Sequence, residues 1–132
     1  MQSTALKYGY SKTASGTFDQ ILDRVRNALQ QEGFGVQAEI NISNALREKL
    51  GVEVPRQLIL GACNPQLAYK AMQAEPEISL LLPCNVTLRQ NGDRVEVAVI
   101  DAEKMMQFLG NPELQPIAEE VKRRLQSVLA RV

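Results

Sequence analysis

The sequence contains no histidine and no tryptophan, and only two of its 132 residues are cysteines. Without histidine, the chain cannot form a Ser-His-Asp or Cys-His nucleophile pair, a zinc site with histidine ligands, or a haem site with a proximal histidine. It also lacks an excess of charge of either sign, because 15 Lys and Arg residues balance 15 Asp and Glu residues. A basic excess is the electrostatic signature of nucleic-acid binding. We therefore predict no nucleic-acid partner.

Long hydrophobic runs are absent as well. The longest apolar stretch, Leu80–Leu82 followed by Pro83, is far shorter than the roughly 20 residues that a membrane span requires. Residues Met1–Tyr10 lack the basic segment followed by an apolar segment that is typical of a signal peptide. Two cysteines are too few for a disulfide-rich secreted scaffold. These features predict a cytoplasmic protein with reduced thiols and no membrane partner.

The sequence contains enough apolar residues to form one hydrophobic core. Hydrophobic residues make up 45% of the chain and charged residues 23%, which is the composition of a folded domain rather than of a disordered segment. We find no internal repeat, low-complexity segment or linker. The length therefore predicts a single domain over residues 1–132.

Capping residues and apolar periodicity predict five helices. The caps and their helices are Thr17 for residues 17–32, Ser43 for a short helix that ends near residue 50, Asn64 for one that ends before Pro76, Asp101 for one that ends at Gly110, and Asn111 for the last. Met72 and Phe108 are predicted to lie on the apolar faces of their helices. In the last helix, the pairs Glu119–Arg123 and Glu120–Arg124 have the spacing of helical ion pairs.

Alternating apolar residues predict the strands. Residues 4–11 are predicted to form one strand with Leu6, Tyr8 and Tyr10 on the same face, and residues 36–40 and 58–62 form two more. Residues 80–90 and 93–100 flank Asn91-Gly92, the preferred sequence of a type I′ hairpin turn. The predicted register pairs Leu88 with Val95, Val86 with Val97, and Cys84 with Val99, and it places Asn85 on the opposite face. Helices mixed with an antiparallel hairpin predict an α+β fold.

Six short motifs in this chain resemble those of the domain-of-unknown-function family 302. They are Gly33-Phe34-Gly35-Val36, Lys49-Leu50-Gly51-Val52, Gly61-Ala62-Cys63-Asn64-Pro65, Ala68-Tyr69-Lys70-Ala71, Leu81-Leu82-Pro83-Cys84-Asn85-Val86 and Gly110-Asn111-Pro112-Glu113-Leu114. The resemblance implies helices packed on a curved antiparallel sheet, similar to one half of the TATA-binding-protein architecture, and a homodimer. It implies no activity and identifies no cofactor, and a fold alone does not carry DNA binding with it.

The motifs and the residue chemistry agree on two Cys-Asn dipeptides as the candidate ligand-binding residues: Cys63, Asn64, Cys84 and Asn85. Cys63 directly precedes a helix N-terminus, where backbone N–H groups and the helix dipole can lower a thiol pKa. Each residue also has a structural interpretation, with Asn64 as a helix cap and Cys84 as a small apolar residue in the core. If their strands are neighbours, the two thiols could lie within reach of each other.

Two functional hypotheses follow. The first is a homodimeric, non-enzymatic module that binds a small ligand or a partner near Asn64 and Asn85. The second is a thiol-dependent protein that handles electrons, sulfur or a soft metal through Cys63, with Cys84 as its resolving partner. No metal site is predicted, because Met105 and Met106 are better explained as core residues than as soft-metal ligands. The absence of histidine, of paired carboxylates and of a phosphate-binding loop favours the first hypothesis.

Overall fold

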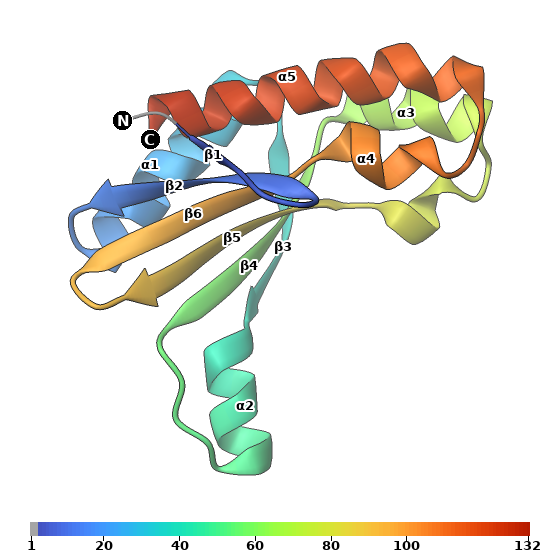
Figure 1. Cartoon of the computed structure of the whole chain (residues 1–132). Coiled ribbons are helices and arrows are strands. Elements are labelled where there is room, and N and C mark those ends of the chain that lie inside the picture. The colour runs from blue at the N-terminus through green and yellow to red at the C-terminus, as the bar shows by residue number, and fades with distance from the viewer. Residues whose placement is uncertain (1–2) are drawn as a thin grey trace.

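A computed structural model describes residues 3–132, so that Met1 and Gln2 of the predicted 1–132 domain lie outside the described residues. Its strands are β1 (Thr4–Ala5), β2 (Gly9–Ser15), β3 (Gly35–Asn41), β4 (Gln57–Cys63), β5 (Cys84–Asn91) and β6 (Arg94–Ile100). Its helices are α1 (Phe18–Gln31), α2 (Ile42–Leu50), α3 (Pro65–Ala74), α4 (Ala102–Gln107) and α5 (Gln115–Arg131), with 3-10 turns η1 (Ile78–Leu81) and η2 (Pro112–Leu114). The predicted α+β class, with helices on a curved antiparallel sheet, is confirmed (Figure 1).

The six strands form one open sheet in the order β1-β2-β6-β5-β4-β3, and every neighbouring pair is antiparallel. One face of the sheet is the core face. A row of paired residues crosses it from Leu60 through Val86 and Val99 to Tyr10. Helices α1 and α5 cover this face (Figure 1) and bury residues such as Ile21 and Leu125 against it.

The opposite face of the sheet carries a second continuous row, which we call the open-face row. It runs through Ile40, Ile59, Thr87, Ala98 and Ser11, one residue from each of five strands. Successive side chains of a strand point to opposite faces, so this row lies on the side away from α1 and α5. None of its five members is buried.

Helix α2 projects from the far end of the β3–β4 ladder, away from α3, α4 and α5 (Figure 1). It contains no buried residue. None of the helices formed by residues 3–132 combines the length and the apolar character needed to cross a membrane.

Three of the five predicted helix caps are confirmed, because the side chains of Thr17, Asn64 and Asp101 each accept a hydrogen bond from a first-turn backbone N–H of the predicted helix. Asn111 caps the 3-10 turn η2 instead of α5, which begins after Leu114 without a side-chain cap. The cap predicted at Ser43 is wrong. Helix α2 begins two residues earlier than predicted, and Asn41 caps it by accepting from the N–H of Asn44. The Ser43 hydroxyl instead accepts from the N–H of Gln57 at 3.0 Å, which joins α2 to β4.

The predicted β5–β6 hairpin is present, but its predicted register is wrong. Asn91 pairs with Arg94, so the two-residue loop is Gly92-Asp93 rather than Asn91-Gly92. Gly92 has φ 63°, and no non-glycine residue of the described chain has a positive φ, which matches a type II′ turn because type I′ needs positive φ at both central positions. As a result Val86 pairs with Val99 and Leu88 with Val97. Each partner shifts by two residues, so every side chain keeps its predicted face.

The predicted strand over residues 4–11 is wrong, because the chain turns back within it. The N–H of Leu6 donates to the carbonyl of Gly9 at 2.8 Å, and this tight turn folds β1 against β2. Leu6 and Tyr8 consequently lie in the turn and are exposed. The apolar positions predicted for Met72 and Phe108 are also wrong, since both side chains are exposed.

The ion pairs of α5 differ in part from those predicted. Glu120 pairs with Arg124 as predicted, and it also pairs with Arg123. Glu119 instead accepts a hydrogen bond from the side chain of Gln115, at 3.0 Å. The hydrogen bond between Gln115 and Glu119 is part of the candidate site described in the next subsection.

Candidate functional site

The strands that carry the two Cys-Asn dipeptides are neighbours in the sheet. Ala62 pairs with Cys84 and Gly61 pairs with Asn85. The motif glycine has a steric reason, because a Cβ atom at Gly61 would lie 2.7 Å from Cγ of Pro83. Any larger residue would push apart the segment just before β5 and the end of β4.

Three of the four predicted site residues meet at one small cavity. Cys63, Asn64 and Cys84 contribute to its wall, together with apolar residues that include Phe34, Leu67 and Met106. The cavity has a volume of about 20 Å³, which is room for about one water molecule. It is therefore a packing space between β4, β5 and the helices rather than a site that can enclose an organic ligand.

The chemistry of the two thiols differs. Burial, with a smaller effect of the neighbouring Cys63, raises the pKa of Cys84 to about 11, so its reactive thiolate form is scarce at neutral pH. Ala62 is the residue directly opposite Cys84, and Cys63 is the next along β4. The pleat of the strand turns the side chain of Cys63 away from that of Ala62, which does not favour a direct approach of the two thiols.

Asn85 is separated from the other three residues. It is exposed on the same sheet face as the open-face row and lines a shallow pocket of about 190 Å³ together with Leu6, Tyr8 and Ile100. The structure thus brings Cys63, Asn64 and Cys84 to the wall of one cavity and leaves Asn85 outside it, on the open face of the sheet.

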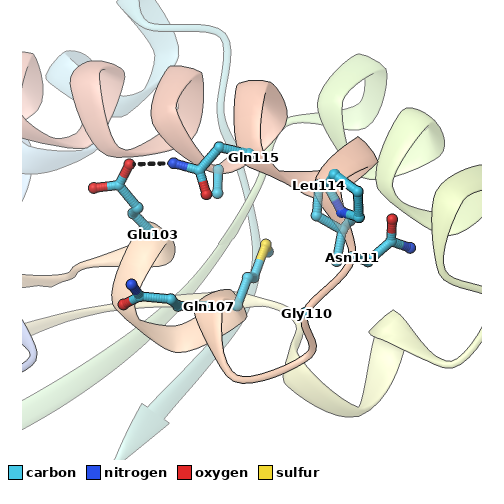
Figure 2. Close-up of a pocket in the computed structure, with 9 residues that line it drawn as sticks. Glu103, Gln107, Gly110, Asn111, Leu114 and Gln115 are labelled. Carbon is cyan, nitrogen blue, oxygen red and sulfur yellow. Dashed lines mark hydrogen bonds between the residues drawn. The ribbon is translucent and has the colours of Figure 1, made fainter.

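A larger pocket, of about 360 Å³, lies between α4, η2 and the start of α5 (Figure 2). We call it the α4–α5 pocket. Its volume is in the range of small-molecule sites. It is lined by Glu103, Met106, Gln107, Gly110, Asn111, Pro112, Leu114, Gln115 and Ala118. Met106, Leu114 and Ala118 are buried members of a second hydrophobic cluster, so the pocket combines an apolar floor with a rim of amides and one carboxylate.

Glu103 is the charged group of this rim, and its two oxygens have different partners. The Gln115 amide donates to Oε2 at 2.7 Å (Figure 2), and the Lys122 ammonium donates to Oε1 at 3.2 Å. Lys122 also contacts the buried carboxylate of Asp101 at 3.5 Å. Hydrogen bonding to Glu103 and to Tyr10 raises the pKa of Lys122. Lys122 is therefore a fixed cation shared between two carboxylates.

Sequence reasoning missed the α4–α5 pocket. The local signal was present, because Glu103 and Gln107 have the i,i+4 spacing that places two side chains on one face of a helix. That spacing is also found on any solvated helix face. The pocket exists only because α4 packs beside α5, a contact between segments that the sequence does not reveal.

Known proteins resemble this chain in sequence and in fold. The family model described as "Domain of unknown function DUF302" matches residues 10–132. The chain belongs to this family. A similar solved structure is the crystal structure of the uncharacterized conserved protein DUF302 from Bacillus stearothermophilus, with 26% identity and a TM-score of 0.89 over 96% of this chain and 98% of that chain. No curated protein sequence matches this DUF302 chain.

Proposed function

We propose that this DUF302 protein is a non-enzymatic, homodimeric module that binds a small molecule in the α4–α5 pocket. The pocket itself carries the proposal. It has the volume of a ligand site, an apolar floor and a few polar side chains at the rim, which is the usual design of small-molecule sites. The described residues include no group of three or more cysteine or carboxylate side chains suited to a metal.

The homodimer part of the proposal is supported by surfaces that remain uncovered in the single chain. The open-face row presents Ile40 beside Ile59, and neither is buried. Helix α2 buries none of its residues, and its last residue, Leu50, is 70% exposed. Apolar surfaces of this kind commonly mark protein interfaces.

A thiol-dependent function is the second candidate, and one observation favours it. Cys63 and Cys84 line the same cavity, and Cys63 directly precedes the N-cap of α3. The raised pKa of Cys84 argues against Cys84 as a resolving thiol, because attack on a disulfide requires the thiolate. This contrast makes Cys63→Ser the variant that separates the two functions.

Native and denatured mass spectra of freshly purified protein test the proposal. We expect native species heavier than whole multiples of the chain mass, with the excess mass retained in Cys63→Ser and lost in Gln107→Trp. Gln107 lines the pocket and is exposed, so a large side chain there can fill the pocket without disturbing the core. An adduct that is lost in Cys63→Ser and retained in Gln107→Trp would support the thiol function instead.

A further inference from the structure

At Gln115 and Asn111, two of the three amide side chains that line the α4–α5 pocket, the hydrogen bonds leave acceptors rather than donors for a ligand. The Gln115 amide nitrogen donates to Glu103 at 2.7 Å and to Glu119 at 3.0 Å. The Asn111 amide nitrogen donates to the carbonyl of Ala74 at 2.9 Å and to Glu75 at 3.1 Å. Each of these amide groups has two N–H donors, so both are fully used.

Acceptor capacity remains on the same side chains. Each oxygen of a carboxylate can accept more than one hydrogen bond, and each oxygen of Glu103 accepts one within residues 3–132. The Gln115 carbonyl oxygen has no hydrogen-bond donor within that part of the chain. The amide of Gln107 can both donate and accept, so the part of the rim formed by Glu103 and Gln115 is the part that a hydrogen-bond donor satisfies better than an acceptor.

The charged side chains near the rim also favour a ligand that donates hydrogen bonds. Glu103, Asp101 and Glu119 bring three negative charges, and Glu75 lies behind Asn111. The cation that contacts this group is Lys122, which is shared between Asp101 and Glu103. One positive charge against three negative charges gives this group of side chains a net negative formal charge.

The floor of the pocket determines the chemistry of the part of the ligand that does not contact the rim. Met106 is 4% exposed, Leu114 2% and Ala118 1%, and these side chains belong to one hydrophobic cluster. These side chains are already shielded from water, so an apolar body that lies on them gains van der Waals contacts more than hydrophobic burial. Methionine adds a flexible, polarizable side chain that adapts to the shape of what it contacts.

From these contacts we infer that the ligand of the α4–α5 pocket is a small organic cation: an ammonium group that donates to Glu103 and Gln115, attached to a short apolar body that lies on Met106 and Leu114. This inference rests on the proposed small-molecule function and names its ligand class. In this inference, Glu103 selects the charge of the ligand, and the buried cluster binds the apolar body of the ligand.

Three probes of equal length test the inference: hexylammonium, hexan-1-ol and hexanoate, each titrated into the full-length protein at pH 7 and followed by ¹⁵N amide shifts. We expect shifts at the pocket residues with hexylammonium and a Kd at least about tenfold lower than that of hexan-1-ol, the size of a charge-assisted hydrogen bond. Hexanoate binds most weakly of the three. Added salt weakens the binding of hexylammonium and leaves that of hexan-1-ol unchanged.

Two variants assign the preference to the pocket. Glu103→Gln removes most of the preference for hexylammonium over hexan-1-ol, and Glu48→Gln on the exposed helix α2 leaves it unchanged. Gln115→Lys, at an exposed position of the rim, shifts the preference toward hexanoate. Both pocket variants leave the buried floor intact, so their folding is readily checked by the unchanged shifts of the sheet residues.

The contrary outcomes separate the inference from the proposed function. If hexan-1-ol or hexanoate binds at the pocket residues as tightly as hexylammonium, the cationic class is wrong and the binding module stands. A preference for hexylammonium that persists in Glu103→Gln also overturns the inference. If none of the three probes moves the pocket residues, the α4–α5 pocket is not the ligand site, and both proposals fail.

Discussion

At the scale of single residues, Asn64 has the clearest structural duty. It is 7% exposed, and its side chain accepts from the N–H of Leu67 at 3.2 Å at the start of α3. We expect Asn64→Ala to lower the free energy of unfolding by about 1–2 kcal/mol, because it leaves a buried N–H without a partner. Asn64→Ser retains an oxygen and recovers most of the loss. Urea denaturation measures both, and equal stability of the two variants would contradict the capping role.

The thiol of Cys84 gives a prediction about pH. Burial raises its pKa in the folded state to about 11 from the ordinary value of 9.0. Because the folded state favours the protonated thiol, this contribution to stability is complete below pH 9 and is lost as the pH rises through 11. Relative to Cys84→Ala, the wild-type protein should lose about 2 kcal/mol of unfolding free energy by pH 11.

Chemical denaturation of both proteins between pH 8 and pH 11 measures this difference. The Cys84→Ala variant serves as the control, since it retains every lysine and tyrosine that titrates in the same range. Parallel stability curves for the two proteins would mean that Cys84 ionises as freely in the folded state as in the unfolded chain.

Residues of the site were predictable from sequence where their role is local. Asn64 and Asp101 could be identified as caps because a cap acts on the N–H groups two or three positions ahead. The alternation of a strand correctly put Cys84 and Asn85 on opposite faces. Glu103 and Gln115 could not be found in this way, because their role in the pocket depends on α4 lying beside α5 (Figure 2).

At the scale of elements, the β5–β6 hairpin shows how one turn residue sets a register. A type I′ turn at Asn91-Gly92 and a type II′ turn at Gly92-Asp93 both use the same glycine. The sequence pattern favours the first, and the structure has the second. The apolar faces of both strands are the same in either register, so the hydrophobic pattern could not distinguish the two.

Substitutions in the turn distinguish the two registers. With φ 63° at Gly92, Gly92→Ala is strained and should cost about 1–2 kcal/mol of stability. Asn91 lies in β5 with a partner in β6, so Asn91→Thr should change stability by less than about 0.5 kcal/mol. Thermal or urea unfolding provides the measurement. A large loss for Asn91→Thr would instead indicate a type I′ turn.

At the scale of the whole molecule, the class and the covered face of the sheet followed from the sequence, but the strand order did not. The apolar stripe of the helix predicted over residues 17–32 includes Ile21 and Val25, and both are buried, whereas the packing of helices on a curved sheet was implied by the family resemblance. The pairing of β2 with β6 joins residues that are 79 to 91 positions apart in the chain. Such pairings arise from the competition among all strands for edges, which no local pattern records.

The proposed homodimer can be tested at the open face of the sheet. A standard interface buries about 800 Å² per partner, and the open-face row extends across five of the six strands. Ile40 lies at one end of this row and is 49% exposed. If two copies pair through this face, Ile40→Lys buries a charge in the interface and converts the dimer to a monomer, with little effect on the fold of the single chain.

Sedimentation equilibrium of the variant and the wild-type protein measures the effect. Leu80→Lys is the matched control, since Leu80 is 82% exposed and lies in η1 rather than on the sheet, so this variant should remain a dimer. Dissociation by both variants would indicate an effect of net charge on association, because the wild-type chain is neutral overall. A wild-type protein that sediments as a monomer would remove the homodimer from the proposed function and leave the α4–α5 pocket, which one chain forms alone, as the part still to be tested with ligands.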